Sequence, residues 1–94
     1  MRTRLKKYSD YGMTWDEARK IIRFCRAPGF QYRHLVVSAA HRANPQIESY
    51  LVQNLCDRVG WIESGAPIDE RSFYGWRKRC IFFLREDFQR LHIL

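Results

Sequence analysis

The sequence predicts an all-α protein that forms one compact domain of about four helices. Three observations indicate this class. Apolar residues recur every three or four positions, helix-capping residues precede these runs and Gly or Pro follows them, and no segment alternates as a strand does. With 94 residues, of which 46% are hydrophobic and 15% aromatic, the chain has the size and composition of a single core. We expect a loosely packed basic arm over residues 1–13 and a helical domain over residues 14–94.

The first helix is expected over residues 15–26. Thr14 and Glu17 have the spacing of a capping box at its start, and Pro28 and Gly29 follow its end. Four apolar residues at helical spacing predict its buried stripe: Trp15, Ala18, Ile22 and Cys25.

The second helix is expected over residues 31–43, and its alanines would let a neighbouring backbone approach closely. The third helix begins at Asn44, a good N-cap, with Pro45 at the first helical position, and it ends near Gly60. Residues 61–68 are expected to form a loop.

The fourth helix is expected to start at Asp69, an N-cap, and to reach about residue 91. Its core-facing residues share one side of the helix: Phe73, Trp76, Cys80, Leu84 and Leu91. At 100° per residue Phe82 falls on the opposite side, among basic and polar residues.

The net charge of +7 belongs to the first half of the chain. Residues 1–43 contain ten Lys and Arg but only three Asp and Glu, whereas residues 44–94 contain seven of each. Such asymmetry favours a polyanionic partner, nucleic acid above all, although a basic surface that only aids solubility gives the same composition.

The first two expected helices and their short turn have the lengths of a helix-turn-helix, although an ordinary helical hairpin fits as well. In that motif the first helix meets the phosphates and the start of the second meets the bases. The residues expected at phosphates are Arg19, Lys20, Arg23 and Arg26, and those expected nearest the bases are Gln31, Arg33 and His34. The basic arm, with Arg4, Lys6 and Lys7, is expected to reach an adjacent groove. The leading hypothesis is a non-enzymatic nucleic-acid-binding module, with DNA the first candidate.

The outer side of the last helix gives an alternative function. A large aromatic residue within a basic face can anchor an acidic protein surface or a second copy of the chain. The residues of this face are Tyr74, Lys78, Arg79 and Phe82. The basic arm, or Trp61 and Ile62, would instead cover Phe82 if the last helix is buried all round.

No catalytic or metal-binding motif occurs in the sequence. Phosphate loops, nucleophile elbows and paired CxxC motifs are absent, so we predict no catalytic residues, no metal and no cofactor. Three widely spaced cysteines are not a disulfide framework and favour a reducing compartment. No apolar run is long enough for a membrane span, so we expect a cytoplasmic protein without a membrane partner.

Several short stretches of the chain resemble small uncharacterised proteins of bacterial prophages and mobile elements. The stretches lie in Ile22–Arg26, Ala39-Ala40, Ala43-Asn44-Pro45 and Ile68–Lys78, so the likeness extends from about residue 14 onward. The resemblance implies a regulatory or accessory protein of a mobile element. It implies no catalytic or binding residues.

Overall fold

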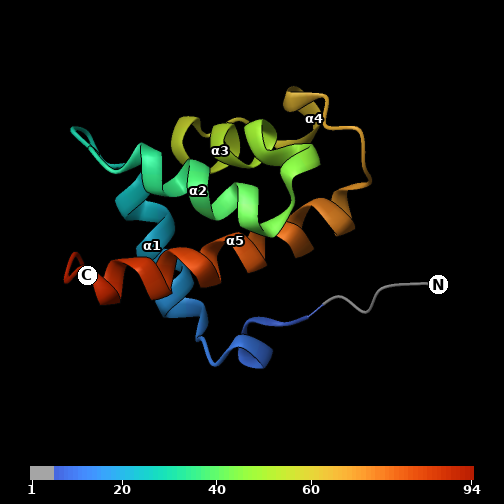
Figure 1. The fold of residues 1–94 in the computed structure, drawn as a ribbon. Helices are drawn as coiled ribbons and strands as arrows, with labels where there is room; N and C mark the ends of the chain where they lie inside the picture. Colours follow the sequence, from blue (N-terminus) through green and yellow to red (C-terminus); the bar gives the residue numbers. More distant parts are fainter. Residues whose placement is uncertain (1–5) are drawn as a thin grey trace.

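The computed structural model describes residues 6–94, and every element of secondary structure in this part of the chain is helical (Figure 1). This confirms the predicted all-α class. In chain order the elements are η1 (Tyr8–Tyr11), α1 (Trp15–Cys25), α2 (Arg33–Ala43), η2 (Pro45–Ile47), α3 (Glu48–Asp57), α4 (Trp61–Ser64) and α5 (Glu70–Arg90).

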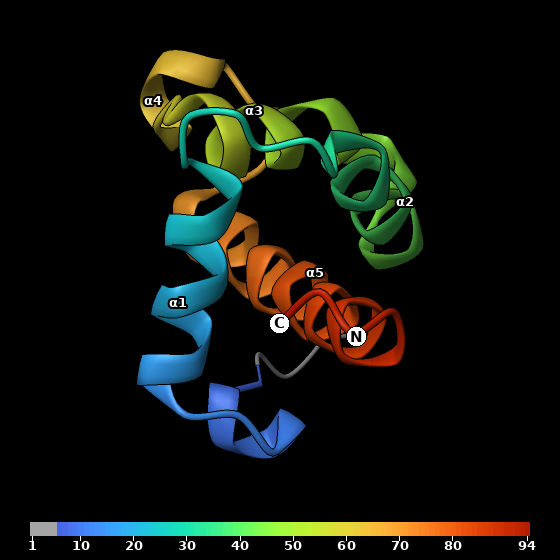
Figure 2. The same ribbon diagram turned by 90° about the vertical axis from the view of Figure 1, so that its left-hand side faces the viewer.

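The long helix α5 is the element on which α1, α2 and the N-terminal η1 pack. Helix α2 is its main partner, α1 lies against another side of it, and α3 packs chiefly on α2 (Figure 2). Fully buried side chains of α5 recur at helical spacing: Phe73, Cys80, Ile81, Leu84 and Phe88. Val36, Ala39 and Ala40 of α2 are also fully buried, and the small alanines let the two helices approach closely. Arg42 of α2 also pairs with the buried carboxylate of Asp87 on α5.

The predicted helix starts are confirmed by hydrogen bonds. The Thr14 hydroxyl accepts from the Glu17 backbone N–H at 3.1 Å, and the Thr14 N–H donates to the Glu17 carboxylate at 3.0 Å. Asp69 accepts from the Ser72 N–H at 3.0 Å. Asn44 accepts from Gln46, although a short 3₁₀ turn, η2, precedes α3 there. These caps satisfy N–H groups that have no partner inside their own helices.

The connection between α1 and α2 differs from the expected turn. Helix α2 starts at Arg33 and α1 ends at Cys25, so seven residues, 26–32, join them. Within this link Phe30 and Tyr32 pack on Phe24, at ring-centroid distances of 5.3 and 6.0 Å, which draws the chain away from a tight turn. The two helices lie apart and pack on α3 and α5 instead of on each other (Figure 2). This arrangement departs from the predicted helix-turn-helix.

The N-terminal segment, residues 6–13, is packed and not the loose arm that the sequence predicts. Tyr8 and Met13 are each only 4% exposed. Gly12 adopts a positive φ of 68°, which lets the chain turn after η1, and its carbonyl accepts a hydrogen bond from Arg85 of α5 at 2.7 Å. Residues 8–13 therefore belong to the helical domain. The predicted contact residue Arg4 lies outside the described residues.

Two further expectations need correction. Residues 61–68 contain the short helix α4, and the indole N–H of Trp61 closes this loop by donating to the Ile68 carbonyl at 2.7 Å. The sequence predicts Leu91 on the core-facing side of the last helix, but Leu91 is exposed because α5 ends one residue before it.

In the described part of the chain, no helix combines the length and the apolar character that crossing a bilayer requires.

Candidate functional site

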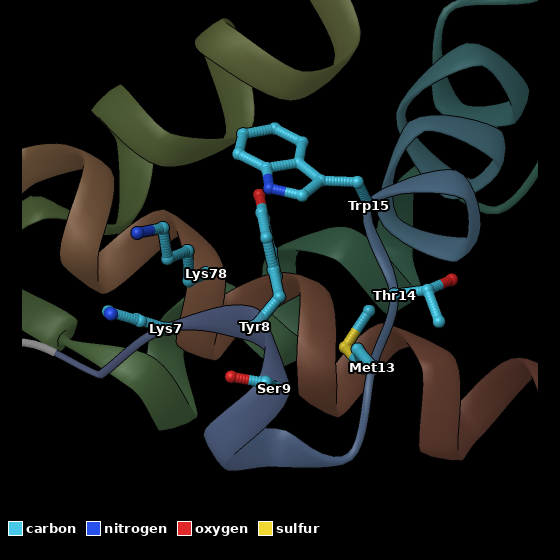
Figure 3. A pocket seen from close by; sticks show the side chains of 7 residues that line it. All are labelled: Lys7, Tyr8, Ser9, Met13, Thr14, Trp15 and Lys78. Carbon is cyan, nitrogen blue, oxygen red and sulfur yellow. The ribbon is translucent and has the colours of Figure 1, made fainter.

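A hollow of about 540 Å³ lies between the N-terminal segment, the start of α1 and the middle of α5 (Figure 3). We call it the Trp15 hollow. Its lining residues are Lys7, Tyr8, Ser9, Met13, Thr14, Trp15 and Lys78. Three separate elements therefore meet at one opening, and each contributes an aromatic or a cationic side chain.

Trp15 is the most unusual residue of this hollow because it is 64% exposed. The sequence predicts it in the buried stripe of the first helix, and this prediction is wrong. The Thr14 cap makes Trp15 the first residue of α1, and the buried Tyr8 lies beside its indole (Figure 3). The two ring centroids are 5.0 Å apart at 74°, an edge-to-face contact. The indole therefore rests on Tyr8 and remains open to solvent.

The charge of the Trp15 hollow is positive. Lys7 and Lys78 line it from the N-terminal segment and from α5, and the Lys78 ammonium lies 5.5 Å from the Tyr8 ring centroid. Burial raises the pKa of the Tyr8 hydroxyl, so it stays neutral, while the charge of Arg77 opposes that shift. Among residues 6–94, no carboxylate lines this hollow. The arrangement suits an anion with an aromatic or other flat group.

Two arginines continue the positive charge along α1. Arg19 and Arg23 lie four and eight residues after Trp15, and this spacing places all three on one side of the helix. Both arginines are exposed, and neither forms an ion pair with another described residue. We call Trp15, Arg19 and Arg23 the α1 row. Lys20 is also exposed but lies beside a different hollow, which it shares with Glu17.

Arg26 and Arg33, which the sequence predicts at nucleic acid, are engaged within the fold. Arg26 donates to the carbonyls of Asn54 at 3.0 Å and Leu55 at 3.3 Å, near the C-terminal end of α3. Burial and the nearby charge of Arg77 lower the pKa of Arg26. These two bonds satisfy carbonyls near a helix end, where intrahelical partners run out.

Arg33 forms two parallel hydrogen bonds with the Asp57 carboxylate, at 2.8 and 3.0 Å. This pairing lowers the pKa of Asp57. Gln31 and His34 are exposed, but Gln31 lies in the connection after α1 and His34 on α2, and neither lines the Trp15 hollow. The base-reading group expected at the start of the second helix is therefore not assembled beside the Trp15 hollow.

The outer face of α5 differs from the alternative that the sequence offers. Phe82 is half-buried because Tyr11 stacks on it, with ring centroids 5.0 Å apart at 29°. Arg79 is exposed and lines a second hollow, of about 390 Å³, together with Lys6 and Asp10. The N-terminal segment therefore covers the aromatic anchor expected there.

The other two residues of that face have separate surroundings. Tyr74 packs on Arg77, whose guanidinium carbon lies 4.7 Å from the Tyr74 ring centroid. Lys78 lines the Trp15 hollow, as described above. The four residues of the expected protein-binding face therefore do not form one exposed patch.

Of the predicted contact residues, the structure brings Lys7, Arg19 and Arg23 to the Trp15 hollow and the α1 row. Sequence reasoning missed Trp15 as a site residue and placed Lys78 in the alternative site. One signal in the sequence pointed to Trp15. It directly follows the capping residue Thr14, and a side chain in the first turn of a helix can extend beyond the neighbouring elements and remain exposed. Within residues 6–94, no three His, Cys, Asp or Glu side chains lie close enough together to hold a metal ion.

The comparisons with known proteins leave the site to be interpreted from its geometry. No protein-family model matches this chain, and no curated protein or solved structure does. The likeness to small proteins of prophages therefore stays a prediction.

Proposed function

We propose that this protein binds nucleic acid without catalysing a reaction, through the Trp15 hollow and the α1 row. A regulatory or accessory role, as in a mobile element, fits such a module. One observation carries the proposal. An exposed indole lies beside two lysines from separate elements, in a hollow that no described carboxylate lines. Three free thiols, two of them buried, suit a reducing compartment such as the cytoplasm.

The charge pattern supports a phosphate-rich partner. Lys7, Lys78, Arg19 and Arg23 are four cations around the hollow and along the row. Each cation that meets a phosphate releases condensed counterions from the nucleic acid, so affinity falls as salt rises. An acidic protein surface would also be attracted. We favour nucleic acid because the hollow combines cations with an open aromatic ring, the pairing by which proteins hold bases and phosphates together.

The test is a salt titration of affinity by fluorescence anisotropy, with labelled duplex and labelled single strands. If four phosphates are neutralised, log K should fall with log salt with a slope of about −3.6 for duplex or about −2.8 for a single strand. Weak binding that ignores salt would refute the proposal.

A matched pair of variants locates the surface. Arg23→Ala should reduce both the affinity and the salt slope, since Arg23 is exposed on the α1 row. Arg71→Ala removes the same charge from an exposed position near the start of α5 that does not line the hollow, and should leave both unchanged. Equal effects of the two variants would mean that the net charge of the chain, and not this surface, governs binding.

A further inference from the structure

We propose that the Trp15 hollow takes an unpaired base, so that the preferred ligand is single-stranded nucleic acid. This inference rests on the proposed function and narrows it to one class of ligand. The base stacks on the indole of Trp15 while Lys7 and Lys78 meet the phosphates on either side of it.

The first support is the state of the indole. Trp15 is 64% exposed, although Tyr8 and Met13, which line the same hollow, are each only 4% exposed. Tyr8 contacts the indole edge-to-face, with ring centroids 5.0 Å apart, and holds it in place. A ring that is held and open is a platform for stacking, and every base presents a flat face to it.

The second support is the size of the hollow and the elements that bound it. The hollow is bounded by the N-terminal segment, α1 and α5, and its volume of about 540 Å³ is that of a small-molecule site. In a duplex both faces of a base are already stacked, and unstacking it costs a few kcal/mol. An unpaired base enters without that cost.

The third support is what lies outside the hollow. The expected groove reader Arg33 is held by Asp57, and neither Gln31, in the connection after α1, nor His34, on α2, lines the hollow. No base-reading helix face is therefore placed beside the hollow within the described residues. Arg19 and Arg23 instead follow Trp15 along α1, where they can accompany the backbone of one strand.

The experiment compares three probes: a thymidine strand of about eight nucleotides, an abasic strand with the same number of phosphates, and a duplex of the same length. We expect the thymidine strand to bind about ten-fold more tightly than the abasic strand and to quench tryptophan fluorescence. Trp15→Ala should remove both the ten-fold preference and the quench while the salt slope remains. Trp15→Phe should keep part of the preference, since a smaller ring still stacks.

Ile62→Ala is the matched control, because Ile62 is an 81% exposed apolar residue on α4, away from the hollow. It should leave all three affinities unchanged. Circular dichroism of Trp15→Ala should match that of the parent protein, since the Thr14 cap is retained.

The outcomes separate the two proposals. Equal affinity for thymidine and abasic strands, or a duplex bound as tightly as the strand, overturns the single-strand inference while nucleic-acid binding stands. Unchanged discrimination in Trp15→Ala also overturns it. Failure of all three probes to bind overturns the proposed function together with the inference.

Discussion

Replacing Asn54 with Leu should remove the two side-chain hydrogen bonds by which α3 is joined to Arg77 of α5 and to the Val59 carbonyl. Asn54 is only 3% exposed. Its side-chain oxygen accepts from the Arg77 guanidinium at 3.0 Å, and its amide nitrogen donates to the Val59 carbonyl at 3.0 Å. Its backbone carbonyl accepts from Arg26 at 3.0 Å. Leucine has a similar volume but makes neither side-chain bond, and it leaves the half-buried Arg77 short of an acceptor.

The magnitude follows from these contacts. A hydrogen bond from a charged donor contributes about 1.5–3 kcal/mol, and a neutral bond about 1 kcal/mol. Burying the additional apolar surface of leucine offsets roughly 1 kcal/mol of that loss. We expect the free energy of unfolding of Asn54→Leu to fall by about 1.5–3 kcal/mol. In a domain of this size that lowers the Tm by on the order of 10–20 °C.

Urea denaturation followed by circular dichroism measures this change. The midpoint should fall while the slope m stays constant, because the folded and unfolded states keep their exposed areas. Gln53→Leu is the matched control on the same helix, since Gln53 is half-exposed and its side chain makes no hydrogen bond with a described residue. It should change stability by less than about 0.5 kcal/mol. If the free energy of unfolding of Asn54→Leu falls by less than about 1 kcal/mol, the hydrogen bonds of the Asn54 side chain do not have the stabilising role assigned to them.

Three further predictions concern ionisation and thiol reactivity. Because burial raises the pKa of Tyr8, its stabilising contribution is complete below pH 10.0, its ordinary value, and is lost as the pH rises through the folded-state value. In thermal melts, the Tm of Tyr8→Phe should fall less at alkaline pH than the Tm of the parent protein. An equal fall in both proteins would contradict this prediction. The Arg33 pairing lowers the pKa of Asp57, so its contribution is present above pH 3.8 and is lost as the pH falls through the lower folded-state value. Arg33→Ala should remove that acid-dependent part of the stability, as urea midpoints across pH would show. A thiol reagent at mildly alkaline pH should label half-exposed Cys56 first, since burial raises the pKa of Cys25 to about 12. Mass spectrometry that finds Cys25 modified first in the folded protein would contradict this order.

Local signals in the sequence predicted the fold class and the helix starts. The caps at Thr14, Asn44 and Asp69 all form, because a capping bond joins residues only two or three positions apart. The packing of the N-terminal segment had no such signal. The bond from Arg85 to Gly12 joins residues 73 positions apart, and nothing local to either residue indicates it.

The site was harder to predict than the fold. Helical periodicity shows which residues share a side of a helix, but the element that covers that side is set by tertiary contacts. Arg23 and Arg26 look equivalent in sequence, yet only Arg26 reaches the carbonyls of α3. Trp15 lies in line with the apolar stripe of α1, but Tyr8 takes the buried place beside it.

The dependence of the core on α5 has a consequence for synthesis of the protein. The N-terminal segment, α1 and α2 are all translated before α5, the helix against which they pack. The buried face of α2 and the side chains of Tyr8 and Met13 then lack their partner and stay accessible to water. A released chain that ends before residue 70 lacks α5 and is therefore a natural client for chaperones and proteases, since the native core closes only when α5 is present.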